Sequence, residues 1–119
     1  MSNPIVHFEI IGKDSKKTVK FYKSLLGWKP KSMKGMDYHM VGAEGGKGIG
    51  GGFGSAAKGK KPRTRIYAEV ANLEKTLKKA VKLGAKVTQK PTQVPNGPRI
   101  AMIDDPDGIS FGFVEAGAM

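Results

Sequence analysis

The sequence predicts an α+β fold in which a strand–helix–strand–strand–strand (βαβββ) module occurs twice. Residues 5–11 and 63–71 alternate apolar and polar side chains, with the period of two that is typical of a half-buried strand. Each stretch is followed by apolar residues at helical spacing, and these runs close at Gly27 and Gly84. An internal repeat explains this order better than two unrelated halves.

The first half of the chain carries a local signal for each element. Asp14 or Ser15 can cap the helix that follows the opening strand, and Gly27 suits the left-handed position after its end. The half closes in a glycine-rich strand, where missing side chains leave room for another backbone or a ligand. The expected elements are strands at 5–11, 28–34, 37–43 and 49–53, and a helix that runs to Leu26.

The glycine-rich stretch also contains a formal G-x-G-x-x-G match at Gly46, Gly48 and Gly51. A phosphate-binding loop of this type needs a helix directly after the glycines, so that the helix N-terminus faces the anion. Here the stretch leads into AAKGKKPR, which has the composition of a linker. We therefore interpret it as a strand and reject a nucleotide-binding loop.

The second half repeats the order of the first. Asn72 is a good cap for its helix, Pro91 interrupts the strand that follows, and Asn96-Gly97 indicates a tight turn. The expected elements are strands at 64–70, 85–94, 99–103 and 109–115, and a helix from Asn72 to Gly84. We expect one domain over residues 1–119, with a first module at about 1–54, a linker at 55–62 and a second module at about 63–119.

Composition excludes several classes of protein. The chain has no cysteine, so neither disulfides nor thiolate metal sites are available. It has no apolar run of membrane-spanning length and no secretion signal, so we expect a soluble, cytoplasmic protein without a membrane partner. The formal net charge is +11, with 18 Lys and 3 Arg, which favours anions over cations as ligands.

This basic charge raises the possibility of a nucleic-acid partner. The lysines, however, are spread over helices and loops, with little aromatic interleaving and no recognised DNA- or RNA-binding motif. The densest basic patch, residues 58–63, lies in the linker and could contact phosphates only nonspecifically. We do not expect nucleic acid as the partner.

Five segments carry a resemblance to a known family. They are HFEI at 7–10, FYKSLLGW at 21–28, IGGGFG at 49–54, YAEVANLEKTLKKAVKLGAKV at 67–87 and IDDPDGISFGFVE at 103–115. With them the chain resembles the vicinal-oxygen-chelate (VOC) superfamily, which includes glyoxalase I, bleomycin-resistance proteins and extradiol dioxygenases. Within it, the chain is most similar to the small predicted enzymes related to lactoylglutathione lyase. The resemblance implies a cupped eight-stranded mixed sheet around a ligand cleft, commonly in a homodimer.

The resemblance also implies where a metal would be held. Metal-dependent members place one ligand on the first and one on the last strand of each module, which here are His7, Gly52, Arg65 and Gly112. Only His7 could bind a metal, because glycine has no side-chain donor and arginine stays protonated. A divalent ion in a protein normally needs three or more protein ligands. We therefore expect no metal and no cofactor.

The polar faces of the two opening strands supply the candidate site. His7 could be a general base near neutral pH, helped by Glu9 or Glu69, or it could be a hydrogen-bonded residue with no catalytic role. Arg65 could hold a carboxylate or phosphate, or form an internal ion pair with Glu9 or Glu69. Tyr67 could stack on a ligand or simply pack. The catalytic candidates are His7 and Glu9, and the ligand-binding candidates are Arg65, Tyr67, Glu69, Gly52 and Gly112.

Two functions follow from these candidates. The first is a glyoxalase-like enzyme of lyase or isomerase type that works without a metal, by acid–base chemistry of His7 and a carboxylate. The alternative is a non-catalytic protein that binds and sequesters a small molecule, as bleomycin-resistance members do. The basic surface argues against a cationic drug and for an anionic or neutral ligand. The sequence alone leaves open whether any reaction is catalysed.

Overall fold

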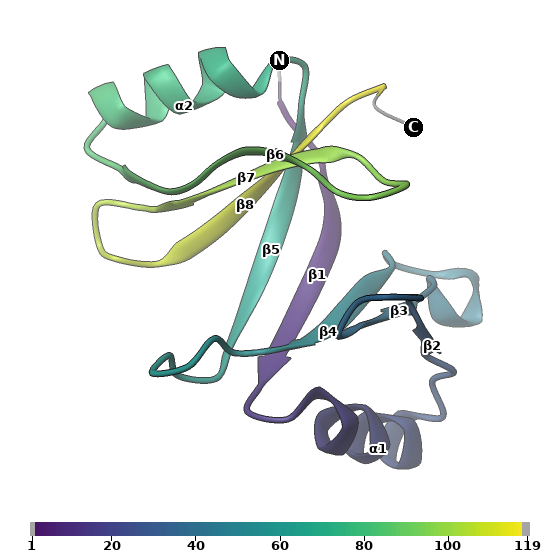
Figure 1. Cartoon of the computed structure of the whole chain (residues 1–119). Coiled ribbons are helices and arrows are strands. Elements are labelled where there is room, and N and C mark those ends of the chain that lie inside the picture. The colour runs from purple at the N-terminus through teal and green to yellow at the C-terminus, as the bar shows by residue number, and fades with distance from the viewer. Residues whose placement is uncertain (1, 118–119) are drawn as a thin grey trace. The chain divides into compact units, whose positions relative to one another are not determined.

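The computed structural model describes residues 2–117 and contains two helices and eight strands (Figure 1). The first half contains β1 (Ile5–Gly12), α1 (Ser15–Leu26), β2 (Lys31–Ser32), β3 (Tyr38–Val41), a short 3-10 turn η1 (Glu44–Gly46) and β4 (Gly51–Ser55). The second contains β5 (Arg63–Val70), α2 (Leu73–Lys82), β6 (Lys86–Gln93), β7 (Arg99–Asp104) and β8 (Ser110–Glu115). The predicted α+β fold of two βαβββ modules is confirmed.

The eight strands form a mixed sheet in which both halves have the same internal order. The first half is arranged β2-β3-β4-β1 and the second β6-β7-β8-β5. In each half the first and last strands pair in parallel (β1 with β4, β5 with β8), and the remaining pairs are antiparallel. The repeat seen in the sequence is therefore also a repeat of topology.

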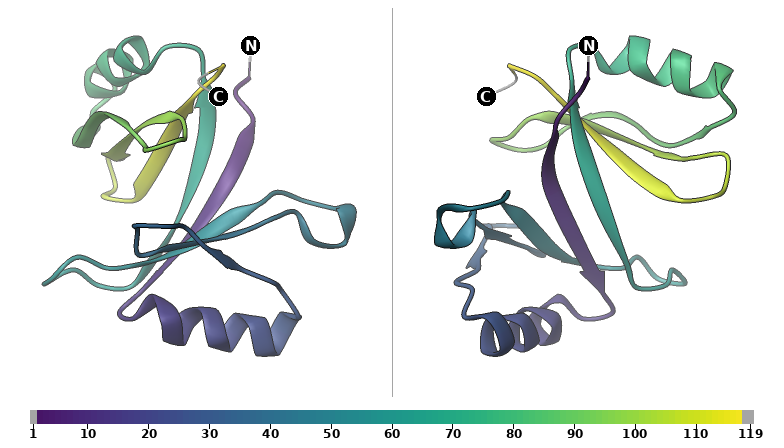
Figure 2. Two further views of the ribbon diagram at one scale, coloured as in Figure 1. Left: turned by 45° about the vertical axis from the view of Figure 1, so that its right-hand side comes forward. Right: turned by 180° about the vertical axis from the view of Figure 1, so that it is seen from behind.

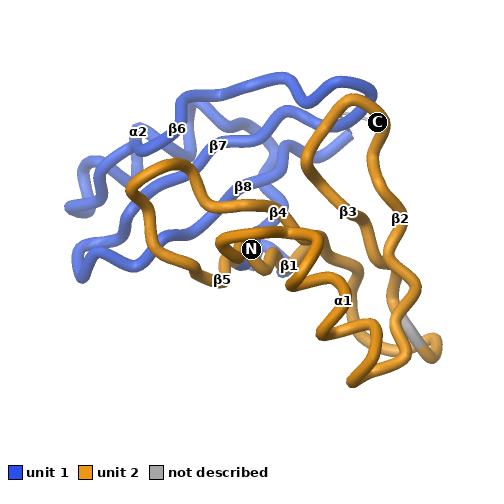
Figure 3. The backbone as a smooth tube through the Cα atoms, turned by 60° about the horizontal axis from the view of Figure 1, so that its bottom comes forward, with its two compact units in different colours: residues 1–6, 66–119 blue, residues 7–65 orange. Residues whose placement is uncertain are grey.

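Two compact units make up the chain (Figure 3). One is residues 7–65, and the other is residues 1–6 together with 66–119. The chain passes between the units inside β1 and again inside β5, at residues 6–7 and 65–66. The units group residues by their packing and the predicted modules group them by the repeat, so the module boundaries stay a prediction.

In the 7–65 unit, α1 covers one face of the strands (Figure 2). An aromatic cluster packs between the helix and these strands. Phe53 of β4 is fully buried, with its ring centroid 5.8 Å from that of Tyr22 on α1 and 6.1 Å from that of Trp28. Phe8 of β1 joins the cluster, 5.7 Å from Trp28. Because side chains alternate across a strand, the neighbours of Phe8 project from the opposite face of β1. The alternation in the sequence predicted this orientation.

The ends of α1 follow the predicted capping signals. The Asp14 side chain accepts a hydrogen bond from the Lys16 backbone N–H at 3.0 Å. At the other end, Gly27 adopts the left-handed conformation (φ 73°) and its N–H bonds to the carbonyl of Lys23. Local sequence thus determines where this helix begins and ends.

The other unit is built around α2 and strands β5 to β8. Asn72 caps α2 by accepting from the Lys75 N–H at 2.9 Å, as predicted. The helix contributes Leu73 and Leu77 to the hydrophobic core. The remaining buried core residues are Val70, Ala101 and Ile103, with Phe111 and Phe113 packed against them. The core therefore lies between α2 and one face of its strands.

The strand boundaries differ by one or two residues from the sequence-based ones in most cases, and the largest differences are in the two strands expected at 28–34 and 49–53. The strand expected at 28–34 is reduced to Lys31–Ser32, because Trp28 turns into the aromatic cluster and Pro30 has no N–H to donate. The strand expected at 49–53 begins two residues later, at Gly51, and runs to Ser55. Pro91 lies inside β6, which is an edge strand with shifts in its pairing to β7.

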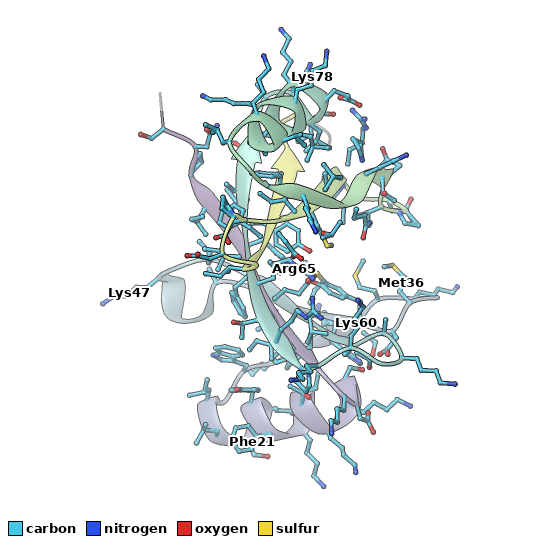
Figure 4. All side chains as sticks on the ribbon, turned by 90° about the vertical axis from the view of Figure 1, so that its left-hand side faces the viewer. Phe21, Met36, Lys47, Lys60, Arg65 and Lys78 are labelled. Atoms are coloured by element: carbon cyan, nitrogen blue, oxygen red, sulfur yellow. The ribbon has the colours of Figure 1, made fainter. Side chains whose placement is uncertain are left out.

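Lysines extend from the surface of both units. Figure 4 shows Lys47 and Lys78 pointing away from the ribbon, and both side chains are exposed. Among residues 2–117, no helix is both long and apolar enough to cross a membrane.

Candidate functional site

Four polar side chains of the 7–65 unit form one continuous hydrogen-bonded chain, which we call the Glu9 network. His7 Nε2 lies 2.8 Å from the hydroxyl oxygen of Tyr38. The Tyr38 hydroxyl donates to Glu9 Oε2 at 2.8 Å, and Arg65 Nη1 donates to Glu9 Oε1 at 2.7 Å. His7 and Glu9 come from β1, Tyr38 from β3 and Arg65 from β5. The network lies on the face of β1 opposite the aromatic cluster.

Glu9 and Arg65 form a buried ion pair. Their side chains are only 9% and 12% exposed. A charge at this depth is stable only when it is paired and hydrogen-bonded, and both oxygens of Glu9 are engaged. Of the two roles that the sequence left open for Arg65, the structure contains the internal ion pair, and Glu9 is the partner.

His7 is held in its neutral form near neutral pH. Burial of the imidazole lowers the pKa of His7 below its ordinary value of 6.5, and the nearby Glu9 carboxylate acts in the opposite direction to a smaller extent. A neutral imidazole has one nitrogen lone pair that can accept a proton. His7 therefore has the protonation state that a general base needs.

The space left by Gly52 is occupied by the Tyr38 ring. Gly52 is buried on β4, paired with Glu9 on one side and with Met40 on the other. A Cβ at position 52 would collide with the ring and hydroxyl of Tyr38. The room predicted for a ligand at this glycine thus accommodates a tyrosine of the same unit.

The other unit contains a second tyrosine–glycine pair. Tyr67 of β5 lies opposite Gly112 of β8, and a Cβ at Gly112 would collide with the Tyr67 ring. Tyr67 is 2% exposed. Glu69, two residues further on, is half-buried, and its backbone N–H donates to the carbonyl of Pro4 at 2.9 Å. These three candidate residues lie in the unit of residues 1–6 and 66–119.

The residues at the four positions of the expected metal site do not fit a divalent metal. His7 is hydrogen-bonded to Tyr38, and Arg65 is a cation that already pairs with Glu9. Gly52 and Gly112 offer no side-chain donor, and tyrosine rings lie against both. Among the side chains that the structure describes, no group of three or more His, Cys, Asp or Glu is arranged to hold a metal ion.

Comparison with known protein families gives a match over almost the whole chain. The sequence model of the Glyoxalase/Bleomycin resistance protein/Dioxygenase superfamily matches residues 4–113. The chain belongs to this superfamily. The resemblance found in the sequence is thereby confirmed. A search of curated proteins found no match.

Solved structures show the same fold at low sequence identity. A hypothetical protein from Bacillus halodurans is 15% identical with a TM-score of 0.69, and the match covers 100% of this chain and 98% of that one. A methylmalonyl-CoA epimerase in complex with methylmalonyl-CoA and NH4+ is 17% identical (TM-score 0.66; 99% and 98% covered). A Legionella pneumophila structure named NAD-dependent benzaldehyde dehydrogenase is 18% identical (TM-score 0.65; 93% and 97% covered). These different names show that the superfamily fold does not by itself determine an activity.

Sequence reasoning missed Tyr38, which connects His7 to Glu9. The alternation Tyr38-His39-Met40-Val41 does place Tyr38 and Met40 on one face of a strand. What it does not give is the pairing of β3 with β4, which brings that face beside Gly52. A bulky residue on the strand that pairs with a buried glycine is the signal that could have found it.

Proposed function

We propose that this superfamily member is a metal-independent enzyme of lyase or isomerase type that moves a proton on a small carbonyl compound, with His7 as the base. The Glu9 network is the observation that supports this most directly: it joins a neutral imidazole, through Tyr38, to a buried carboxylate. A structurally similar protein is named an epimerase, and inverting a carbon centre beside a carbonyl requires that a proton leave and return.

In the proposed step, His7 takes a proton from the carbon next to the carbonyl group. The electron pair of the broken C–H bond moves onto the carbonyl oxygen and forms an enolate. The imidazolium exchanges its proton with solvent and then returns a proton to the enolate. Return to the same carbon inverts it when the enolate has turned its other face toward His7. In a compound with a hydroxyl on that carbon, the hydroxyl proton moves to the enolate oxygen, and return of the proton to the former carbonyl carbon isomerises the compound. The negative charge of Glu9 stabilises the imidazolium formed in this step. A buried cation near a carboxylate has a lower free energy than one without a counter-charge.

The charges of the site favour a small ligand that is neutral or carries little negative charge. Glu9 neutralises Arg65, so the network has no net charge while His7 is neutral. A guanidinium nevertheless has five N–H donors, which allows one group to hold Glu9 and an oxygen of a ligand. The formal net charge of +11 also attracts anions to the surface.

Hydrogen–deuterium exchange on carbon tests the proposal without a known substrate. The protein would be incubated in D2O, with and without EDTA, together with methylmalonyl-CoA, pyruvate or glyceraldehyde, and deuterium next to the carbonyl would be followed by NMR. We expect exchange with at least one of these probes, and a rate that falls about 10²–10⁴-fold in the His7→Gln variant. Exchange that persists in His7→Gln, or that EDTA abolishes, would contradict the proposal.

The alternative is a binding protein that sequesters its ligand, and one observation favours it. In the part of the chain whose side chains the structure describes, every buried side-chain nitrogen or oxygen has a hydrogen-bond partner, so the polar groups of the site are satisfied without a ligand. A binder of this kind should keep its affinity when His7 is replaced by Ala. Equilibrium dialysis of the same three probes against wild type and His7→Ala therefore separates the two functions.

A further inference from the structure

Tyr38 stands between the proposed base and its carboxylate, and we propose that it is a positioning residue that fixes the ring tautomer of His7. With Tyr38 in place, neutral His7 carries its proton on Nε2, and Nδ1 is the nitrogen that accepts a proton from the substrate. The inference rests on the proposed role of His7 as a base, because it names the nitrogen atom at which that base acts.

The tautomer follows from counting protons along the Glu9 network. Tyr38 has a single hydroxyl proton, and it donates this proton to Glu9 Oε2 at 2.8 Å. The 2.8 Å contact between Tyr38 and His7 Nε2 therefore needs a proton from the imidazole. An ionised carboxylate attracts the tyrosine proton more strongly than a neutral imidazole does, so the opposite arrangement is disfavoured. The hydrogen bond at one ring nitrogen thus decides which nitrogen keeps its lone pair.

Gly52 is what allows the Tyr38 ring to reach this position. The ring lies against Gly52 of β4. Gly52 is also the residue that pairs with Glu9 in the parallel β1–β4 pair. Any side chain at position 52 would meet the ring and the hydroxyl of Tyr38. The contact with Gly54 is looser, with a Cβ there 3.4 Å from the Tyr38 ring, which is ordinary van der Waals contact. The position of the Tyr38 hydroxyl therefore depends on glycine at position 52.

The same arrangement stabilises the base after it has accepted a proton. Protonation at Nδ1 leaves the Nε2–H donating to Tyr38, whose hydroxyl still donates to Glu9. The new positive charge is then connected to the carboxylate through two hydrogen bonds that were already present, so no side chain has to move. Arg65 holds Glu9 in place from the other oxygen.

Nitrogen-15 NMR of the imidazole rings tests this directly and needs no substrate. The chain has only two histidines, so His7 can be assigned by comparison with the His39→Gln variant. At about pH 8 a histidine ring is neutral and carries a single ring proton. In wild type this proton should be on Nε2, and Nδ1 should be unprotonated. In Tyr38→Phe, which keeps the ring and loses the hydroxyl, the two shifts should move toward each other. Gly52→Ala should have the same effect by displacing the ring.

Tyr22→Phe is the matched control, since it makes the same change in the aromatic cluster on the other face and should leave the His7 spectrum unchanged. A wild-type spectrum with the proton on Nδ1 overturns the inference, whether or not the variants fold. An unchanged spectrum in folded Tyr38→Phe also overturns it. Carbon exchange in D2O, by contrast, tests the proposed function itself, and there Tyr38→Phe should lose about tenfold in rate.

Discussion

At the scale of single residues, Glu9 is the side chain on which the candidate site depends. One of its oxygens accepts a hydrogen bond from Arg65 and the other from Tyr38, and the side chain is 9% exposed. A carboxylate in this position costs desolvation energy, which the pair with Arg65 offsets only while both partners remain. The site is therefore sensitive to the loss of either one.

Removing one partner of this ion pair should destabilise the protein strongly. We expect Glu9→Leu or Arg65→Met alone to lower the free energy of unfolding by about 3–5 kcal/mol, because each leaves a buried charge unpaired. The double variant should be more stable than either single variant, since it leaves no charge. Urea denaturation measures all three. Glu74→Gln, which breaks a pair of Arg99 on the exposed surface, is the control and should have a much smaller effect. The prediction would be contradicted if neither single variant lowered the free energy of unfolding by more than Glu74→Gln does.

His7 should make stability depend on pH in a defined direction. Because burial lowers its pKa below 6.5, the unfolded chain binds a proton at a higher pH than the folded chain does. The stabilisation is thus fully present above pH 6.5 and is lost as the pH falls through that value toward the lower folded pKa.

Urea denaturation between about pH 7.5 and 5 checks this. Wild type should lose stability across the range, and His7→Gln should lose less. The second histidine, His39, is present in both proteins, so the comparison isolates the effect of His7. Equal slopes would show that His7 titrates alike in the folded and unfolded chains.

At the scale of elements, α1 is attached to the strands beneath it by its first residue. Ser15 is 1% exposed, its hydroxyl donates to the Asp37 carboxylate, and its backbone N–H donates to the Ser55 hydroxyl at 3.0 Å. The same hydroxyl lies 3.4 Å from His39 Nε2. These hydrogen bonds tie the start of the helix to β3 and β4 through side chains that are far apart in the sequence.

Ser15→Ala should therefore destabilise the protein by about 0.5–1.5 kcal/mol at neutral pH, the usual net value of one hydrogen bond. The Ser15 hydroxyl is the main cause of the lowered pKa of Asp37, and Ser55 adds to it. A lowered carboxyl pKa contributes stability that is lost as the pH falls below the ordinary value of 3.8. The penalty of Ser15→Ala should thus shrink below that pH. Ser24→Ala, on the exposed side of α1, is the control and should have little effect. Fluorescence of Trp28, the single tryptophan, follows unfolding.

The elements also show which features can be predicted from sequence. The helix caps and the faces of β1 depend on neighbouring residues and were predicted from them: Asn72 directly, and Asp14 as one of two candidates with Ser15. The Tyr38–Gly52 contact depends on how β3 pairs with β4, over a separation that no local pattern encodes. The choice between a ligand and Glu9 as the partner of Arg65 likewise needed the three-dimensional pairing. The local elements could be read from the sequence, but the connections within the site could not.

At the scale of the whole molecule, the two units share strands. The chain passes between them inside β1 and inside β5, and no free linker is present at either crossing. The homodimer that the family resemblance implies concerns a second chain and stays a prediction, which sedimentation at micromolar concentration would test. The shared strands, by contrast, lead to a prediction for the single chain.

We expect the units to unfold together, because losing one would remove the ends of strands on which the other is built. Leu73 is fully buried in the core beside α2, so Leu73→Ala should lower the free energy of unfolding by about 2–5 kcal/mol. Trp28 lies in the other unit. Its fluorescence should nevertheless shift to lower urea by as much as the far-UV circular dichroism does. Leu83→Ala makes the same change at a position that is 69% exposed and should move neither signal. A circular dichroism transition that shifts while the Trp28 transition stays in place would show that the units unfold independently.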